Sequence, residues 1–175
     1  SNWNNTASGL PQVRIHLIEK FANAHGFAHL GAYLEARVGM PDRFPTFGII
    51  RDFLLAGKDV LQIQDANVDG RSTMEDEIIR TAKAVMDFLM NLSEDALKKM
   101  SPDDLNALLR YDLQTIFEYL ITSRREETYK FFEFYRAFTF RLISSQSLPL
   151  KLFGWDCVTQ LVEYSESMAP PPRSY

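Results

Sequence analysis

The sequence predicts an all-α fold: six to seven helices in succession, arranged as an armadillo/HEAT-like α-α superhelix or as an irregular helical bundle. Apolar residues recur at three- and four-residue spacing along several long segments. Helix start signals precede several of these segments. No convincing strand pattern interrupts them, and the short connections favour antiparallel neighbours.

The first predicted helix spans residues 11–25, with Val13, Leu17 and Phe21 on one face and Gly26 at its end. A second helix is predicted over residues 27–38. Two helices joined at a glycine form a tight helical hairpin or corner.

The third predicted helix spans residues 47–62, after a possible cap at Thr46. A polar segment without periodicity follows it. The next helix covers residues 74–92, and Ser72 and Glu75 have the spacing of a capping box. Its predicted core face consists of Ile78, Ala82, Val85 and Leu89.

Two serines mark the next helix starts. Ser93 is the predicted cap of a short helix, and Ser101 precedes Pro102 and two acidic residues, a full start signal for a helix that reaches residue 123. The last predicted helix opens at Leu148 and ends near residue 167.

Seven aromatic residues lie between Tyr129 and Leu142. At helical spacing, one line along this segment forms the predicted structural core: Phe131, Tyr135, Phe138 and Leu142. The opposite side is predicted to face water and consists of Glu126, Lys130, Glu133, Ala137 and Arg141, with Glu126 spaced to pair with Lys130. Because the basic residues point away from the rings, the segment does not match a stacking platform for nucleic acid.

Composition narrows the function classes. With 19 basic and 23 acidic residues the formal charge is −4, so no nucleic-acid partner is predicted. No apolar run reaches the length of a membrane span, so no membrane partner is predicted either. The single cysteine, Cys157, fits a reducing compartment, and a cytoplasmic location is expected.

Three parts of the chain are expected. Residues 1–10 are interpreted as the remnant of an expression tag with a disordered lead-in, because the chain opens on Ser1 and Asn2. Residues 11–167 form the helical interaction domain. Residues 168–175, rich in proline, are the expected exit linker.

One loop resembles half of a calcium-binding loop. Asp65, Asn67 and Asp69 alternate ahead of Gly70, but the twelfth position is Asp76 where that loop has a bidentate glutamate. The favoured interpretation is a solvated loop, so no metal site and no cofactor is predicted.

Three further side chains are candidates for chemistry. His25 and His29 have a ligand spacing, but the predicted helix break falls between them and no third ligand is evident. Cys157 has no signature of a nucleophile and is interpreted as a structural thiol. No catalytic residue is predicted.

Three segments, 18–38, 88–100 and 129–158, resemble consecutive stretches of the non-catalytic region of the very large fat-facets-type ubiquitin-specific proteases. The matching residues are Ile18, Phe21, Gly26, Phe27, Phe88, Leu89, Leu92, Ser93, Glu94 and Asp95. The resemblance implies a parent thiol-dependent deubiquitinase whose papain-like catalytic domain lies elsewhere, since this segment lacks the cysteine and histidine boxes of that domain.

The implied function is a non-catalytic scaffold that positions ubiquitinated substrates or partner proteins. Two alternatives stay open: a free-standing all-α adaptor unrelated to ubiquitin, and a helical protein that binds a divalent cation at the loop of Asp65.

Overall fold

The computed structural model describes residues 12–63 and 70–168, and over these ranges it is helical without a strand, which confirms the all-α prediction. The elements are α1 (Gln12–Asn23), α2 (Gly26–Glu35), the 3-10 helix η1 (Pro41–Arg43), α3 (Phe47–Ile63), α4 (Arg71–Asn91), α5 (Glu94–Lys98), α6 (Pro102–Asn106), the π-helix η2 (Ala107–Leu113), α7 (Gln114–Tyr119), α8 (Arg125–Ile143) and α9 (Leu148–Met168). In these ranges, no helix combines the length and the apolar character needed to cross a membrane.

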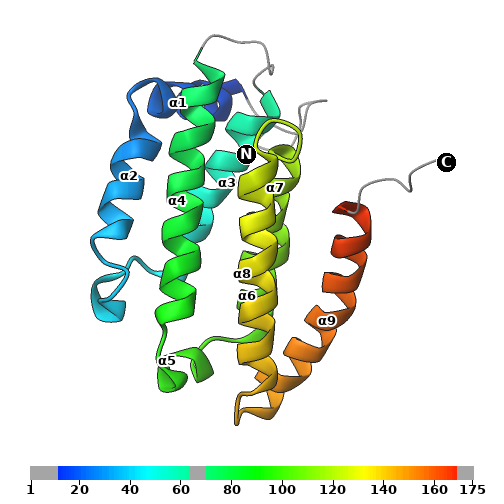
Figure 1. The fold of residues 1–175 in the computed structure, drawn as a ribbon. Coiled ribbons are helices and arrows are strands. Elements are labelled where there is room, and N and C mark those ends of the chain that lie inside the picture. The colour runs from blue at the N-terminus through cyan, green and yellow to red at the C-terminus, as the bar shows by residue number, and fades with distance from the viewer. Residues whose placement is uncertain (1–11, 64–69, 169–175) are drawn as a thin grey trace, which may run out of the picture.

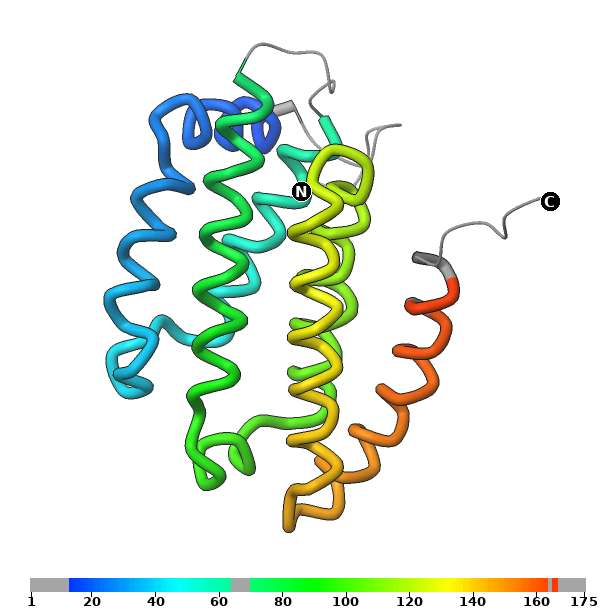
Figure 2. The backbone as a smooth tube through the Cα atoms, in the orientation of Figure 1, coloured from blue at the N-terminus to red at the C-terminus, as the bar shows by residue number. Residues whose placement is uncertain are grey.

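The helices form two rows (Figure 1). In one row α2 packs on α4, α4 on α8, and α8 on α9. In the other row α3 packs against η2 and α7, and α1 lies across one end. Figure 2 shows that α9 leans away from the bundle toward its C-terminal end. The two rows form an irregular bundle. The alternative prediction, an armadillo/HEAT-like superhelix, is not confirmed.

The aromatic segment forms the centre of α8. Phe131, Phe138 and Leu142 are fully buried, and Tyr135 is 3% exposed. The ring of Phe131 stacks on Phe117 of α7 at a centroid distance of 4.9 Å. This stripe therefore joins α8 to its neighbours.

The outer face of α8 differs from the prediction at three points. Lys130 pairs with Glu127 at 3.5 Å, not with Glu126. Arg141 is half-buried and donates hydrogen bonds to the carbonyl oxygens of Leu89, Met90 and Leu92, which end α4. Carbonyl oxygens in the last turn of a helix lack the usual intrahelical partners and carry partial negative charge, so a cation is stabilising there. Two rings of the segment also lie on the surface, Tyr129 at 39% and Phe140 at 64% exposure.

The predicted face of α1 is only partly correct: Phe21 packs against the core, but Val13 and Leu17 do not. Val13 and Leu17 are 63% and 57% exposed, whereas Ile18 and Ala22 are buried. Both pairs satisfy helical spacing, and it is the packing of α1 on α3 that decides which pair is buried.

The turn between α1 and α2 lies one residue before the predicted stop. His25 adopts the left-handed conformation, with φ 58°, and Gly26 is the first residue of α2. The ring of Phe21 lies where a Gly26 side chain would begin, 2.4 Å from the Cβ position. A larger residue at position 26 would therefore displace the Phe21 ring.

The starts of two helices match the predicted serine caps. The Ser93 hydroxyl accepts from the amide of Ala96, and the Ser101 hydroxyl accepts from the amide of Asp104. The predicted capping box of α4 is wrong, because Gly70, with φ 85°, starts that helix at Arg71.

Ser72 and Glu75 instead hold the turn before α8. Arg124 donates to Ser72 at 2.7 Å and lies 3.6 Å from Glu75, and Ser123 donates to Glu75 at 2.6 Å. Ser72 and Glu75, which the sequence predicts to cap a helix, therefore form a tertiary contact. In the face of α4 beyond them, Ile78, Ala82, Val85 and Leu89 are buried as predicted.

Candidate functional site

An apolar pocket of about 240 Å³ lies where the connection between α2 and α3 crosses α4. α3, α4, the α5 region and η2 contribute the other walls. The lining residues are Pro41, Phe44, Pro45, Phe47, Ile50, Val85, Phe88, Leu92, Ala96, Lys99, Met100 and Leu108.

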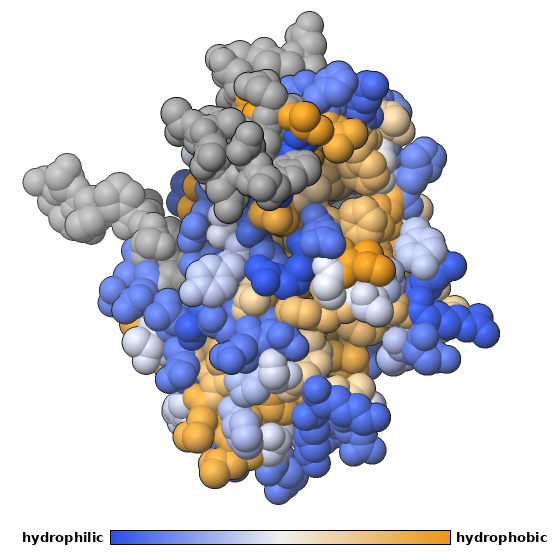
Figure 3. Space-filling model, turned by 180° about the vertical axis from the view of Figure 1, so that it is seen from behind, coloured by the Kyte–Doolittle hydropathy of each residue, from blue (hydrophilic) through white to orange (hydrophobic). Residues whose placement is uncertain are grey.

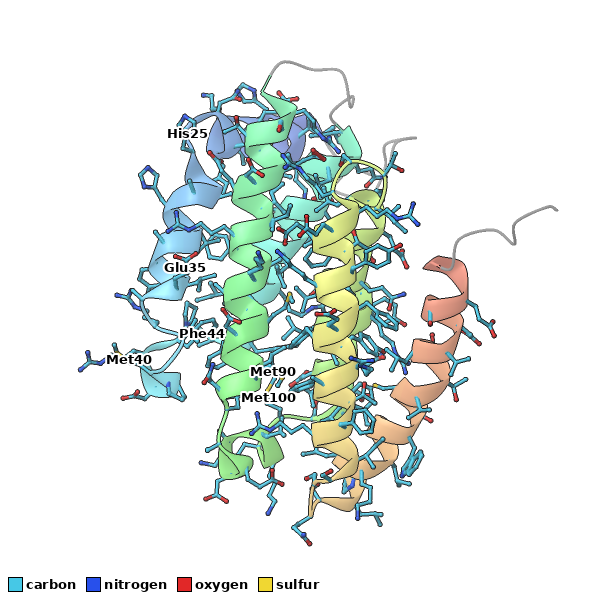
Figure 4. The ribbon with its side chains drawn as sticks, in the orientation of Figure 1. His25, Glu35, Met40, Phe44, Met90 and Met100 are labelled. Carbon is cyan, nitrogen blue, oxygen red and sulfur yellow. The ribbon has the colours of Figure 1, made fainter. Side chains whose placement is uncertain are left out.

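The pocket exists because Phe44 anchors the connection on α4. Its ring stacks on Phe88 with centroids 3.7 Å apart and planes 5° apart, and its side chain is buried (Figure 4). Pro41 and Pro45 restrict the backbone on both sides of this ring. The pocket lies beneath this anchored connection.

Two features of the wall define what the pocket accepts. Lys99 is its only charged lining residue and is exposed to solvent. Met100 contributes a flexible thioether, which adapts to differently shaped apolar groups. Ligand sites typically combine an apolar wall with a few polar groups at the rim, as here. The arrangement suits a large apolar group with a carboxylate beside it.

The calcium-like loop falls largely outside the described residues. Asp65, Asn67 and Asp69 all lie in the gap between residues 63 and 70. Asp76 is described: it is exposed and pairs with Arg124 at 3.1 Å. Within the described ranges, no group of three or more potential ligands among histidine, cysteine, aspartate and glutamate could hold a metal ion.

The two histidines have separate surroundings. The Nδ1 atom of His25 lies 2.7 Å from the Glu77 carboxylate, which ties the α1–α2 turn to α4 (Figure 4). His29 lies on the exposed side of α2. The structure therefore places one of them in a tertiary contact and the other in solvent.

Cys157 is fully buried beside Tyr135 and Arg110. Burial raises the pKa of this thiol, although the neighbouring Tyr135 and Arg110 lower it in part. A thiol with a raised pKa is protonated at neutral pH, so it is neither a good nucleophile nor a good metal ligand.

Asp112 of η2 is the most buried charged residue with ion pairs. Arg51 donates two hydrogen bonds to it, at 2.7 and 3.2 Å, and Lys58 donates another at 2.9 Å. Both cations come from α3, so the cluster joins α3 to the π-helix. The hydrogen bonds of the Asp112 carboxylate join two elements of the fold, so we interpret this cluster as structural.

Exposed apolar residues on α9 offer a further surface: Leu148, Leu152, Trp155 and Val162 are 64%, 58%, 56% and 53% exposed. Apolar residues also reach the surface between hydrophilic ones on the face shown in Figure 3. None of these four residues lines the pocket beneath Phe44.

The sequence prediction did not identify the pocket. A buried ring between two prolines, Phe44 between Pro41 and Pro45, is the signal that was available, because an aromatic residue in a short connection normally packs on something. No family model, curated protein or solved structure matches the chain.

Proposed function

We propose that the chain is a non-catalytic helical interaction module that binds a partner protein in the pocket beneath Phe44. The observation that carries this proposal is an apolar pocket with one cation, Lys99, at its edge. A partner segment with a large apolar side chain next to an aspartate or glutamate satisfies both features.

The pocket is suited to a protein anchor. Most of its wall consists of side chains already packed in the bundle, such as Ile50, Val85 and Leu92, which are all buried. A preformed wall costs little ordering on binding. The lysine at the edge selects against basic segments, because a like charge placed beside it is repelled.

Two neighbouring lysines allow a matched test. Lys98 and Lys99 are both exposed, but only Lys99 lines the pocket. Peptides selected from a random library on the wild-type protein should carry a large apolar residue beside an acidic one. Lys99→Glu should weaken their binding about tenfold or more, and Lys98→Glu should leave it within about twofold.

A blocking variant completes that test. Ala96→Leu adds volume to the pocket wall and should abolish peptide binding without reversing any charge. Selected peptides that bind Ala96→Leu and Lys99→Glu as tightly as the wild type would show that the pocket is not the binding site.

The resemblance to fat-facets-type proteases supports a more specific proposal, in which this module positions substrates or partners for a cysteine-protease domain in the same parent chain. The free-standing adaptor is the alternative. Sequencing the complete transcript separates them: a catalytic domain in the same reading frame supports the scaffold, and a short complete product supports the adaptor.

A further inference from the structure

A second, more polar pocket of about 360 Å³ opens between α6 and the first turns of α9. It shares no residue with the pocket beneath Phe44. Asp103, Asn106, Arg110 and Asp156 contribute its polar wall, and Phe153 and its neighbours contribute the apolar wall.

Two buried polar atoms of this pocket lack hydrogen bonds. The Nη2 atom of Arg110 and the Oδ1 atom of Asn106 are both buried, and neither forms a hydrogen bond in the structure; the Arg110 side chain also lies beside the buried Cys157 thiol. Native proteins satisfy nearly all buried donors and acceptors, either internally or through a bound molecule. The pair therefore indicates a ligand that accepts a hydrogen bond from Arg110 and donates one to Asn106.

The surroundings of Arg110 leave its charge available. Its Nε atom donates to the Tyr135 hydroxyl at 3.5 Å, and its guanidinium lies 5.7 Å from the centre of the Phe153 ring. The described residues provide no ion pair to it within 4.0 Å. A guanidinium held in this way is a preorganised site for a carboxylate.

Two carboxylates line the same pocket. Asp103 and Asp156 are exposed, and neither forms an ion pair within the described part of the chain. Together with Arg110 they give the pocket an excess of negative charge, which disfavours a simple anion. A ligand with a carboxylate for Arg110 and a cation for the aspartates fits both signs.

We propose that this pocket binds a free α-amino acid with an apolar side chain. Its carboxylate accepts from Arg110, and its ammonium group donates to Asn106 and pairs with the aspartates. The side chain packs on Phe153. The pocket volume exceeds what such a ligand needs, and ordered water fills the rest. The inference is independent of the proposed partner binding, because the two pockets share no residue.

The primary experiment is an NMR titration of the full chain with three probes of similar apolar shape. Leucine carries both charged groups, 4-methylpentanoate lacks the ammonium group, and 3-methylbutylamine lacks the carboxylate. We expect saturable shifts of the resonances of α6 and the start of α9 with leucine, and at least about tenfold weaker binding of each analogue.

Two variants locate the site. Arg110→Lys keeps the charge but loses the planar pair of donors, so leucine should bind about tenfold more weakly. Asp156→Asn, at an exposed position, should weaken binding about fivefold while the melting temperature stays unchanged. Asp95→Asn, an exposed change outside both pockets, is the matched control and should have no effect.

Three results would overturn the proposal. The first is a folded wild-type protein whose resonances show no saturable shift at about 10 mM leucine, because binding weaker than this is not specific. In that case the buried atoms of Arg110 and Asn106 would bind water alone. The second is equal binding of leucine and 4-methylpentanoate. The third is unchanged leucine affinity in Asp156→Asn.

Discussion

Gly154 of α9 lies directly against the backbone of Ile143 in α8. A Cβ atom at Gly154 would stand 2.9 Å from the Ile143 nitrogen and 3.0 Å from the Cβ of Leu142. Atoms at these distances overlap, and the nearest of them is backbone nitrogen, which cannot rotate away. The crossing of α8 and α9 is therefore set by the absence of a side chain at this one position.

Gly154→Ala should destabilise the protein by about 1–3 kcal/mol, the usual cost of overpacking. The measurement is urea denaturation followed by circular dichroism. Gly48→Ala in the first turn of α3 is the matched control, because nothing lies within 4 Å of its Cβ position. The control should gain up to about 1 kcal/mol from helix propensity. Equal stability of the two variants would show that the α8–α9 contact is looser than described.

Asp112→Asn should cost about 3 kcal/mol, because it removes the charge that balances Arg51 and Lys58 around a fully buried position. The control is Glu35→Gln. Glu35 also pairs with an arginine, Arg80 at 2.7 Å, but both side chains are almost half exposed. Exposed pairs contribute less than about 1 kcal/mol. Chemical denaturation of both variants compares the two, and an equal loss would contradict a structural role for Asp112.

The helical period was enough to predict α8. Phe131, Phe138 and Leu142 follow one another at spacings of seven and four residues, and only one helix face accommodates them. The same rule failed for α1, where the Val13 and Ile18 faces are both periodic. Only the position of α3, which is remote in the sequence, selects between them.

Tertiary contacts explain the remaining misses. No residue near Asp112 in the sequence indicates a buried cluster, since its partners Arg51 and Lys58 lie 61 and 54 positions away. The pocket likewise depends on Phe44, in the connection between α2 and α3, meeting Phe88 of α4. A pattern read along one segment does not contain such pairings, whereas local signals such as the Ser93 and Ser101 caps are complete within four residues.

Cys157 should be unreactive in the native protein. The thiol is fully buried and burial raises its pKa, so both access and the thiolate fraction are low. Ellman's reagent at pH 8 should label it at least about a hundredfold more slowly than in denaturant. Rapid labelling of the folded chain, with α9 still helical by circular dichroism, would contradict the packing of α9 on α8.

Tyr135 should make stability fall at alkaline pH. Burial raises its pKa from 10.0 to about 12. Between these values the unfolded chain loses the phenolic proton while the folded chain keeps it, so stability is fully present below pH 10 and is lost as pH rises through 12.

The wild type should accordingly lose about 2 kcal/mol more than Tyr135→Phe over that range. Denaturation midpoints of both proteins at successive pH values measure the difference. Parallel pH profiles would mean that the Tyr135 hydroxyl titrates as an exposed phenol does.

The buried rings of α8 should stabilise the fold and should not bind nucleic acid. Phe138 is fully buried, so Phe138→Ala should cost about 3–5 kcal/mol. Glu133→Ala on the exposed face should change stability by no more than about 0.5 kcal/mol. Thermal melts of the two variants are compared, alongside a titration of each with single-stranded RNA at physiological salt. Rings buried in the core have no face free for a base, and the net charge of −4 does not attract a polyanion. The opposite result would have two parts: the wild type binds RNA tightly, and Phe138→Ala loses that binding while it melts like the wild type. Such a result would show that the rings bind nucleic acid.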